Sequence, residues 1–443
     1  MKRGFYTIMA AQFFSSLADN ALLIAAIALL AQLHGEAWLV PLLKALLHVP
    51  YVALAPFVGP FADAWPKGKV MFFTNTIKVT GCLVMLFYGA MATSGAGQQV
   101  IVLVAYGIVG LGCASYSPAK YGILTELLPP ERLVVANGWI EGLTVLSTII
   151  GILLGGILIG TGVSARLLGI DLPFMDTSID TPAEAAIAVI VFFYMVAAIF
   201  NLFIPDTGAR YEKQAARPIK LLIDFGHCFK TLWRDKLGQI TLAITTLFWG
   251  AGATLILILL RWAQDHLGLG LSQGSILQGV FAFGSAAGAI VAARFIPLKR
   301  ALVVLPAGVV MGVVVMAMTL VSAMPMVYAL LILSGALAGF FVVPMNALLQ
   351  HRGHVMLSAG HSIAVQNFNE NLCILVMLAL YGVMLANDIH INTIIIIFGA
   401  FVAFTTTMVI VRHRYNQRVH GDAVRIIGIE KGESIAHFIG RPH

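Results

Sequence analysis

Five ionisable side chains lie inside long apolar stretches of this 443-residue sequence: Asp19, Lys78, Lys120, Glu141 and Glu370. An ionised group at the centre of a membrane helix costs about 2.5 to 3.5 kcal/mol on insertion scales, so each should face a partner or a wet cavity. Side chains of both charge signs suit a zwitterionic ligand. The chemistry indicated is binding of a charged group within a membrane.

Further polar residues accompany these groups at helical spacing, which predicts one inward-facing polar stripe on each of three helices. Lys120 is expected to bind an anionic group of such a ligand, and the carboxylates are expected to bind a cationic group. Lys78 is expected to brace a neighbour or reach toward the membrane surface, and it stays outside the predicted site. The candidate ligand-binding residues are Asp19, Asn20, Lys120, Tyr121, Asn137, Glu141, Asn346, Gln366, Asn367 and Glu370.

Two structural alternatives remain open for these polar residues. The cluster in residues 366–371 could instead form hydrogen bonds between neighbouring helices. Asp19 and Lys120 could form a buried ion pair, which is compatible with a binding role.

The elements that must position these residues are membrane helices. The chain is 59% hydrophobic and 11% charged, with a mean hydropathy of +0.92, which excludes a soluble enzyme. The first apolar run is too long for a signal peptide and contains Asp19, so it is predicted to be retained. The predicted spans are residues 5–32, 39–62, 70–93, 100–119, 138–162, 183–204, 239–262, 271–296, 301–322, 325–348, 361–386 and 391–411.

Lysine and arginine gather in every second connection and at both ends of the chain, which places both termini in the cytoplasm. The longest polar connection follows the sixth span. The predicted units are an N-terminal six-helix bundle (1–205), a central cytoplasmic loop (206–238), a C-terminal six-helix bundle (239–411) and a basic cytoplasmic tail (412–443).

The two bundles show signs of a duplicated unit. Aligning NGWIEG at 137–142 with QNFNEN at 366–371 pairs Glu141 with Glu370. Aligning residues 116–128 with 342–354 pairs Lys120 with Asn346 in the corresponding helix of each half. The predicted fold class is an all-α polytopic membrane protein whose twelve transmembrane helices form two pseudo-symmetric bundles.

This organisation, with GPFADAWPKGK at 59–69, resembles the major facilitator superfamily. That family carries a glycine, an aspartate four residues later, and then a glycine with basic residues between its second and third helices. The resemblance implies a conformational switch made of Asp63, Gly68, Lys69 and Arg132. Asp63 is expected to contact a helix end or a basic residue near Arg132.

Several segments more closely resemble the bacterial lysophospholipid transporter family. They include FFSSLADNALL at 13–23, YSPAKYGIL at 116–124, FFVVPMNALLQ at 340–350 and AVQNFNEN at 364–371. The resemblance implies alternating-access flipping of lysophospholipids, such as lysophosphatidylethanolamine, from the outer to the inner leaflet of the bacterial inner membrane. It also implies a functional partner there, an acyltransferase–acyl carrier protein synthetase that reacylates them.

Enzymatic functions lack sequence support. No histidine is followed five residues later by an aspartate, as acyltransferases require, and no GxxxxGK[ST] loop is present. The four cysteines are too far apart to indicate a metal cluster. We expect no cofactor, no metal and no nucleic-acid partner, and a chain that works as a monomer among membrane lipids. The alternative function is a proton-linked exporter of amphiphilic drugs.

Overall fold

The computed structural model describes residues 3–35, 39–168, 179–209, 217–269 and 271–421, and its regular elements are all helices. In chain order they are α1 (Arg3–Gln32), α2 (Leu39–Ala53), α3 (Ala55–Ala64), α4 (Lys67–Leu86), α5 (Tyr88–Met91), α6 (Gly95–Leu127), η1 (Pro130–Arg132), α7 (Leu133–Ile159), α8 (Thr161–Leu168), α9 (Pro182–Leu202), α10 (Pro218–Arg234), α11 (Gly238–Asp265), α12 (Leu271–Phe295), η2 (Leu298–Val304), α13 (Leu305–Ala317), η3 (Met318–Leu320), α14 (Met324–Met356), α15 (Ala359–Ala386) and α16 (Ile391–Val419).

Eleven helices in the described ranges are long and apolar enough to cross a membrane, and the bent pair α2 and α3 makes a twelfth span. The bend between the two members of the pair is 67°. It falls at Leu54, whose backbone is not helical, and Pro56 then occupies the first turn of α3. A proline is tolerated there because the first helical N–H groups have no partner within the helix. The prediction of twelve spans in an all-α fold is confirmed.

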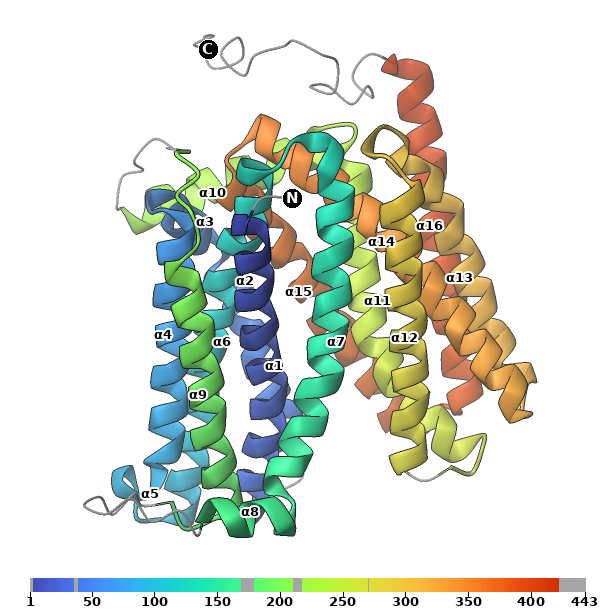
Figure 1. Cartoon of the computed structure of the whole chain (residues 1–443). Coiled ribbons are helices and arrows are strands. Elements are labelled where there is room, and N and C mark those ends of the chain that lie inside the picture. Colours follow the sequence, from blue (N-terminus) through green and yellow to red (C-terminus); the bar gives the residue numbers. More distant parts are fainter. Residues whose placement is uncertain (1–2, 36–38, 169–178, 210–216, 270, 422–443) are drawn as a thin grey trace.

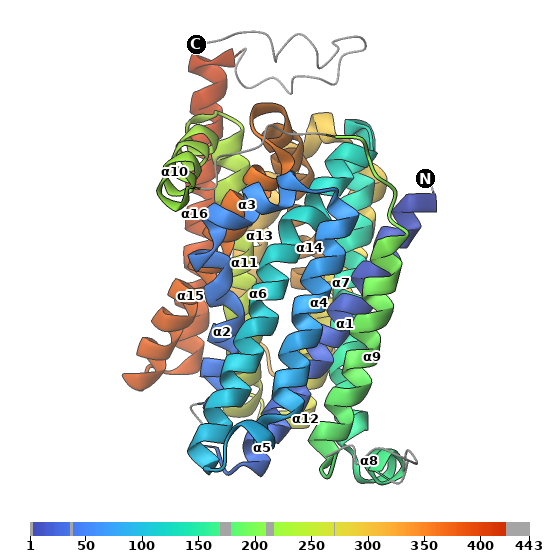
Figure 2. The ribbon, with the colours of Figure 1, turned by 90° about the vertical axis from the view of Figure 1, so that its left-hand side faces the viewer.

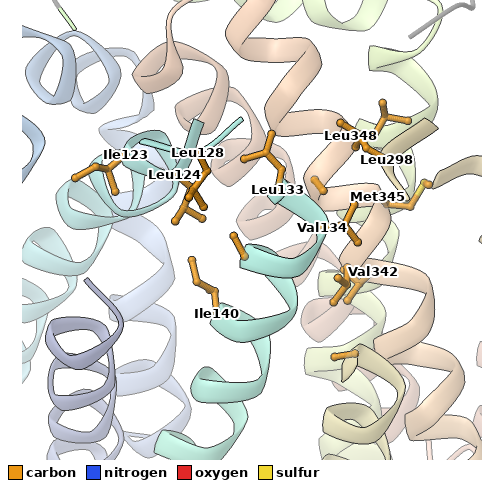
Figure 3. Packing of buried hydrophobic residues seen from close by; sticks show 14 of the residues in the cluster. Ile123, Leu124, Leu128, Leu133, Val134, Ile140, Leu298, Val342, Met345 and Leu348 are labelled. Carbon is orange, nitrogen blue, oxygen red and sulfur yellow. The ribbon is translucent and has the colours of Figure 1, made fainter. Parts of the chain in front are cut away.

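The spans form two side-by-side bundles (Figure 1). Helices α1 to α9 form one bundle around a core that includes Leu22, Tyr106 and Tyr194. Helices α11 to α16 form the other around a core that includes Trp262 and Phe398. A third apolar cluster joins the bundles through α6, α7, η2 and α14 (Figure 3).

The first helix begins and the last helix ends at the same end of the molecule, which we call the terminal end (Figures 1 and 2). Helix α10 and the short α3 lie at this end, whereas α5 and α8 lie at the opposite end. The described part of the basic connection 206–238 that forms α10 therefore lies at the end where α1 begins and α16 ends.

Helix extends into two of the segments that were predicted to lie outside the spans. The connection 206–238 contains a helix, α10, whose apolar residues pack on the bundle beside Leu349 and Val365. The predicted tail from residue 412 begins inside α16, which continues to Val419. Hydropathy marks where a helix leaves lipid, whereas the backbone hydrogen bonds continue into water as long as the local sequence permits. Residues 422–443 lie outside the described part of the chain.

Candidate functional site

Asp19 lies near the middle of α1 and forms an ion pair with Lys78 of α4. The Lys78 Nζ is 2.9 Å from both carboxylate oxygens of Asp19. The Tyr194 hydroxyl of α9 donates a third hydrogen bond to Asp19, at 2.6 Å. The Lys78 side chain is 1% exposed and that of Asp19 is 26% exposed. Lys78 and Tyr194 therefore fix the orientation of the Asp19 carboxylate, and part of that carboxylate remains accessible to a ligand.

The pairing of Asp19 differs from the alternative considered above. Its partner is Lys78, not Lys120, so Lys78, which was left out of the predicted site, directly contacts one of the candidate residues. Lys120 instead places its ammonium 4.2 Å from the ring centre of the adjacent Tyr121, and both residues are half-buried on α6. Asn20 donates from its amide to the Ser16 carbonyl of its own helix, at 2.8 Å.

The polar residues of α15 are buried and bonded to several helices. Gln366 donates to Glu370 at 2.7 Å and lies 3.1 Å from Asn346 of α14. Asn367 donates to Ser117 of α6 at 2.9 Å, which joins the two bundles. The interhelical bonding considered as an alternative is thus present for part of this cluster.

Asn371 and Asn369, on the same stretch of α15, reach in other directions. Asn371 bonds to His48 of α2 at 2.8 Å, and Asn369 accepts from the Trp233 indole of α10 at 3.3 Å. Tyr51, also on α2, lies within electrostatic range of Asp19 and of Glu370. One carboxylate from each bundle therefore acts on the same residue of α2.

Asn137 of α7 forms a reciprocal amide pair with Gln350 of α14. Each side chain donates to the other at 2.9 Å, and both are buried. Asn137 was predicted to bind ligand, but this geometry ties the bundles together near the terminal end. Glu141 lies one turn further along α7, and its side chain is outside the described part of the structure.

Asp63, at the end of α3, reaches the first turn of α15. Its Oδ1 accepts a hydrogen bond from the Gly360 backbone N–H at 3.0 Å. Its Oδ2 accepts one from the hydroxyl of Ser358, which also caps α15, and lies 3.0 Å from His361 Nδ1. Lys67 completes the group at 2.6 Å from Asp63. A carboxylate at a helix N-terminus meets both unpaired N–H groups and the positive end of the helix dipole.

The helix-end contact predicted for Asp63 is present, but its basic partner is Lys67 and not a residue near Arg132. Lys67 also lies 3.5 Å from Glu126 of α6. Arg132 and Lys69 are exposed, and Gly68 packs against Ile204 and Asn201 at the end of α9.

The residues that sequence reasoning missed are Lys78, Lys67, Gln350, Ser358 and His361. Only Lys78 carried a usable signal, because a lysine inside an apolar run requires a counter-charge. The described residues contain no group of three or more His, Cys, Asp or Glu that could hold a metal ion.

An apolar pocket of about 200 Å³ lies inside the C-terminal bundle. Its floor includes Ile258 of α11 and Phe398 of α16, both buried. Leu380 of α15 and Phe401 of α16 are more exposed and line the rim. These residues belong to the parts of α11, α15 and α16 that lie away from the terminal end.

Two six-helix halves with charged groups near mid-membrane define a secondary transporter of the major facilitator type. The profile of the Major Facilitator Superfamily matches residues 8–368. The lysophospholipid transporter LplT of Yersinia enterocolitica is 40% identical over 385 residues, which cover 87% of this chain and 88% of that protein. The LplT of Yersinia pestis is also 40% identical, covering 87% of both chains. The chain therefore belongs to the major facilitator superfamily and, within it, to the family of the LplT lysophospholipid transporters.

Solved structures agree on the fold. A bacterial homologue of the iron transporter ferroportin, in an outward-facing state, superposes with a TM-score of 0.71 at 13% identity, covering 94% of this chain and all of that chain. The Escherichia coli fucose:proton symporter FucP superposes with a TM-score of 0.70 at 13% identity, covering 93% and 98%.

Proposed function

We propose that this chain is a flippase that moves lysophospholipids, such as lysophosphatidylethanolamine, from the outer to the inner leaflet of a bacterial inner membrane. The 40% identity to transporters of that name supports the substrate class. The observation that carries the proposal is Asp19, an ionised residue in mid-membrane that its neighbours fix but leave 26% exposed. Such a group can accept an ammonium without first losing its own counter-ion.

We assign the two charged groups of the lipid head group to two different sets of protein side chains. Lys120 and the hydroxyl of Tyr121 bind the phosphate, since a lysine ammonium donates strong, charge-assisted hydrogen bonds to phosphate oxygens. Asp19 takes an ammonium, and Glu370 offers a second carboxylate on the opposite bundle. Asn20, Asn346, Gln366 and Asn367 remain proposed polar contacts, as does Glu141.

The acyl chain imposes a separate requirement. Burying a methylene contributes roughly 0.8 kcal/mol, so exposing a long chain to water would cost about 10 kcal/mol or more. We assign the tail to lipid or to an apolar cleft while the head group crosses between the bundles. The apolar pocket of about 200 Å³ beside α15 and α16, in the half of the bundle away from the terminal end, supports this assignment because it offers apolar space.

The proposed cycle is alternating access with the terminal end in the cytoplasm. The described hydrogen bonds between the bundles, from Asp63, Asn137 and Asn367, lie toward this end, which supports a state closed to the cytoplasm in this cycle. Release to the inner leaflet requires these contacts to break. The proposed units remain 1–205, 206–238 and 239–411, with both termini cytoplasmic, working as a monomer that supplies an acyltransferase–acyl carrier protein synthetase.

Reconstitution tests the function directly. Vesicles that carry lysophosphatidylethanolamine in one leaflet should lose it from that leaflet when the protein is present. Lys120→Ala should slow the transfer while the protein stays folded, and Lys230→Ala, an exposed lysine of α10, should leave the transfer unchanged. Absence of transfer by the wild-type protein, with proton-driven efflux of an amphiphilic dye in its place, would favour the drug-exporter alternative.

A further inference from the structure

The ammonium of Lys78 is fully coordinated inside the N-terminal bundle. Its three N–H donors have three acceptors: both oxygens of Asp19 at 2.9 Å and Ser15 Oγ at 3.0 Å. The rings of Tyr116 and Tyr194 lie 5.1 and 5.5 Å away, within the range of cation–π attraction. This set of acceptors and rings is a cage for a primary ammonium.

The cage is held by groups other than the lysine. Tyr194 donates to Asp19 at 2.6 Å, and Ser15 donates to Asn75 at 2.9 Å. These bonds keep the carboxylate and the hydroxyl oriented whether or not an ammonium lies between them. The buried Tyr116 hydroxyl and the amide nitrogen of Asn75 have no hydrogen-bond partner among the described residues, so the cage contains polar groups that the lysine does not use.

The aliphatic part of the Lys78 side chain is closely packed between α4 and α6. A Cβ at Gly112 of α6 would lie 2.7 Å from the Lys78 Cγ and 2.9 Å from the Thr74 carbonyl. Only a residue without a side chain permits α4 and α6 to approach around this stem. The absence of a side chain at Gly112 therefore provides the space that the Lys78 side chain occupies between α4 and α6.

We propose that Lys78 is a tethered cation that occupies a preformed ammonium cage, and that the cage without its lysine binds a primary alkylammonium from solution. Lys78 is a positioning residue: by filling the cage it fixes the orientation of the Asp19 carboxylate, whose exposed edge is then available to the head group. The positioning role rests on the proposed function, whereas the cage itself does not.

Binding is tested by truncating the Lys78 side chain and adding a small alkylammonium ion that replaces the deleted atoms. Lys78→Ala deletes three carbons and a nitrogen, the heavy atoms of n-propylammonium. This ion should raise the Tm of purified Lys78→Ala in a concentration-dependent manner and leave the wild-type Tm unchanged. Tetramethylammonium, which has no N–H donor, should raise neither, and Lys78→Ala with Asp19→Asn should abolish the effect. An equal response of wild type and variant, or none in the variant, overturns the cage.

Transport is tested in the vesicles described above. Lys78→Ala should slow lysophosphatidylethanolamine transfer by tenfold or more, and n-propylammonium should restore it. Lys78→Met fills the space without a charge, so it should be slow and should not respond to the ion. Full transfer by Lys78→Met, or a Tm response of Lys78→Ala without restored transfer, overturns the positioning role. Failure of the wild type to transfer the lipid overturns the proposed function and leaves the Tm result standing.

Discussion

At the scale of single residues, the chain keeps its charges in the membrane by neutralising them in place. Asp19 and Lys78 sum to zero charge, and their hydrogen bonds are complete enough to offset much of the desolvation cost. Removing one partner leaves an uncompensated charge, which costs more than removing both. The pair therefore makes a sharper prediction than either residue alone.

Asp19→Asn should lower stability by about 3 kcal/mol, because it leaves the ammonium of Lys78 buried without its counter-charge. Lys78→Met should lower stability by less, because Asp19 is partly exposed and keeps its hydrogen bond from Tyr194. The double variant should be more stable than either single variant. Thermal unfolding in detergent, followed by tryptophan fluorescence, measures the three Tm values. Additive losses in the double variant would contradict the pairing.

At the scale of elements, α10 is the main addition to the predicted helices. Phe225 and Phe229 contact Phe368 of α15 through ring centres 5.5 and 6.1 Å apart. The turn after α10 is also fixed, because Asp235 accepts two bonds from Arg352 at 2.7 and 2.9 Å. Helix α10 is therefore a strap that is packed on the terminal end and anchored at one of its ends.

The labelling rate of the Cys228 thiol, which lies on α10, can be used to measure how tightly this strap is packed. Burial, together with the charges of Asp224 and Asp63, raises the pKa of the Cys228 thiol to about 11. Only the thiolate reacts with maleimide, so labelling should be slow at neutral pH and should rise about tenfold per pH unit up to the pKa. Phe368→Ala should loosen α10, lower the pKa of Cys228 and speed its labelling at pH 8.

Labelling followed by mass spectrometry measures these rates, in a background where Cys373 is replaced by serine. Lys230→Ala, on the exposed side of α10, is the matched control and should label at the parent rate. Equal rates for Phe368→Ala and its parent would show that the aromatic contacts do not hold the strap.

At the scale of the whole molecule, the bundles meet closely toward the terminal end. A Cβ added at Gly122 of α6 would lie 3.2 Å from the Ala359 Cβ at the start of α15. Disulfides bring Cβ atoms to about 3.5 to 4.5 Å, so a few tenths of an ångström of relaxation would permit one here. Alternating access requires this contact to separate in each cycle.

The double variant Gly122→Cys with Ala359→Cys should form a disulfide on mild oxidation and then lose lysophosphatidylethanolamine transfer. Reduction should restore the transfer, because the cross-link alone blocks opening. Each single-cysteine variant is a control and should be insensitive to oxidant. Undiminished transfer in the oxidised double variant would contradict opening at the terminal end.

Much of the fold was predictable because the bilayer imposes a simple length and polarity on each span. The polar stripes that contain Asp19 and Glu370 were predictable for the same reason, since ionised groups are rare in lipid. The bend at Leu54 and helix α10 were missed, because neither changes the hydropathy enough to interrupt or create a span.

The sequence by itself determined that this chain crosses a membrane about twelve times, in two related halves, with charges kept inside. Only the tertiary structure decided the partners: Lys78 for Asp19, Gln350 for Asn137, and the start of α15 for Asp63. The physical reason is that hydropathy is a property of each segment, summed along the chain. A hydrogen bond instead depends on which helices face each other and at what depth, and close packing of the bundles sets both.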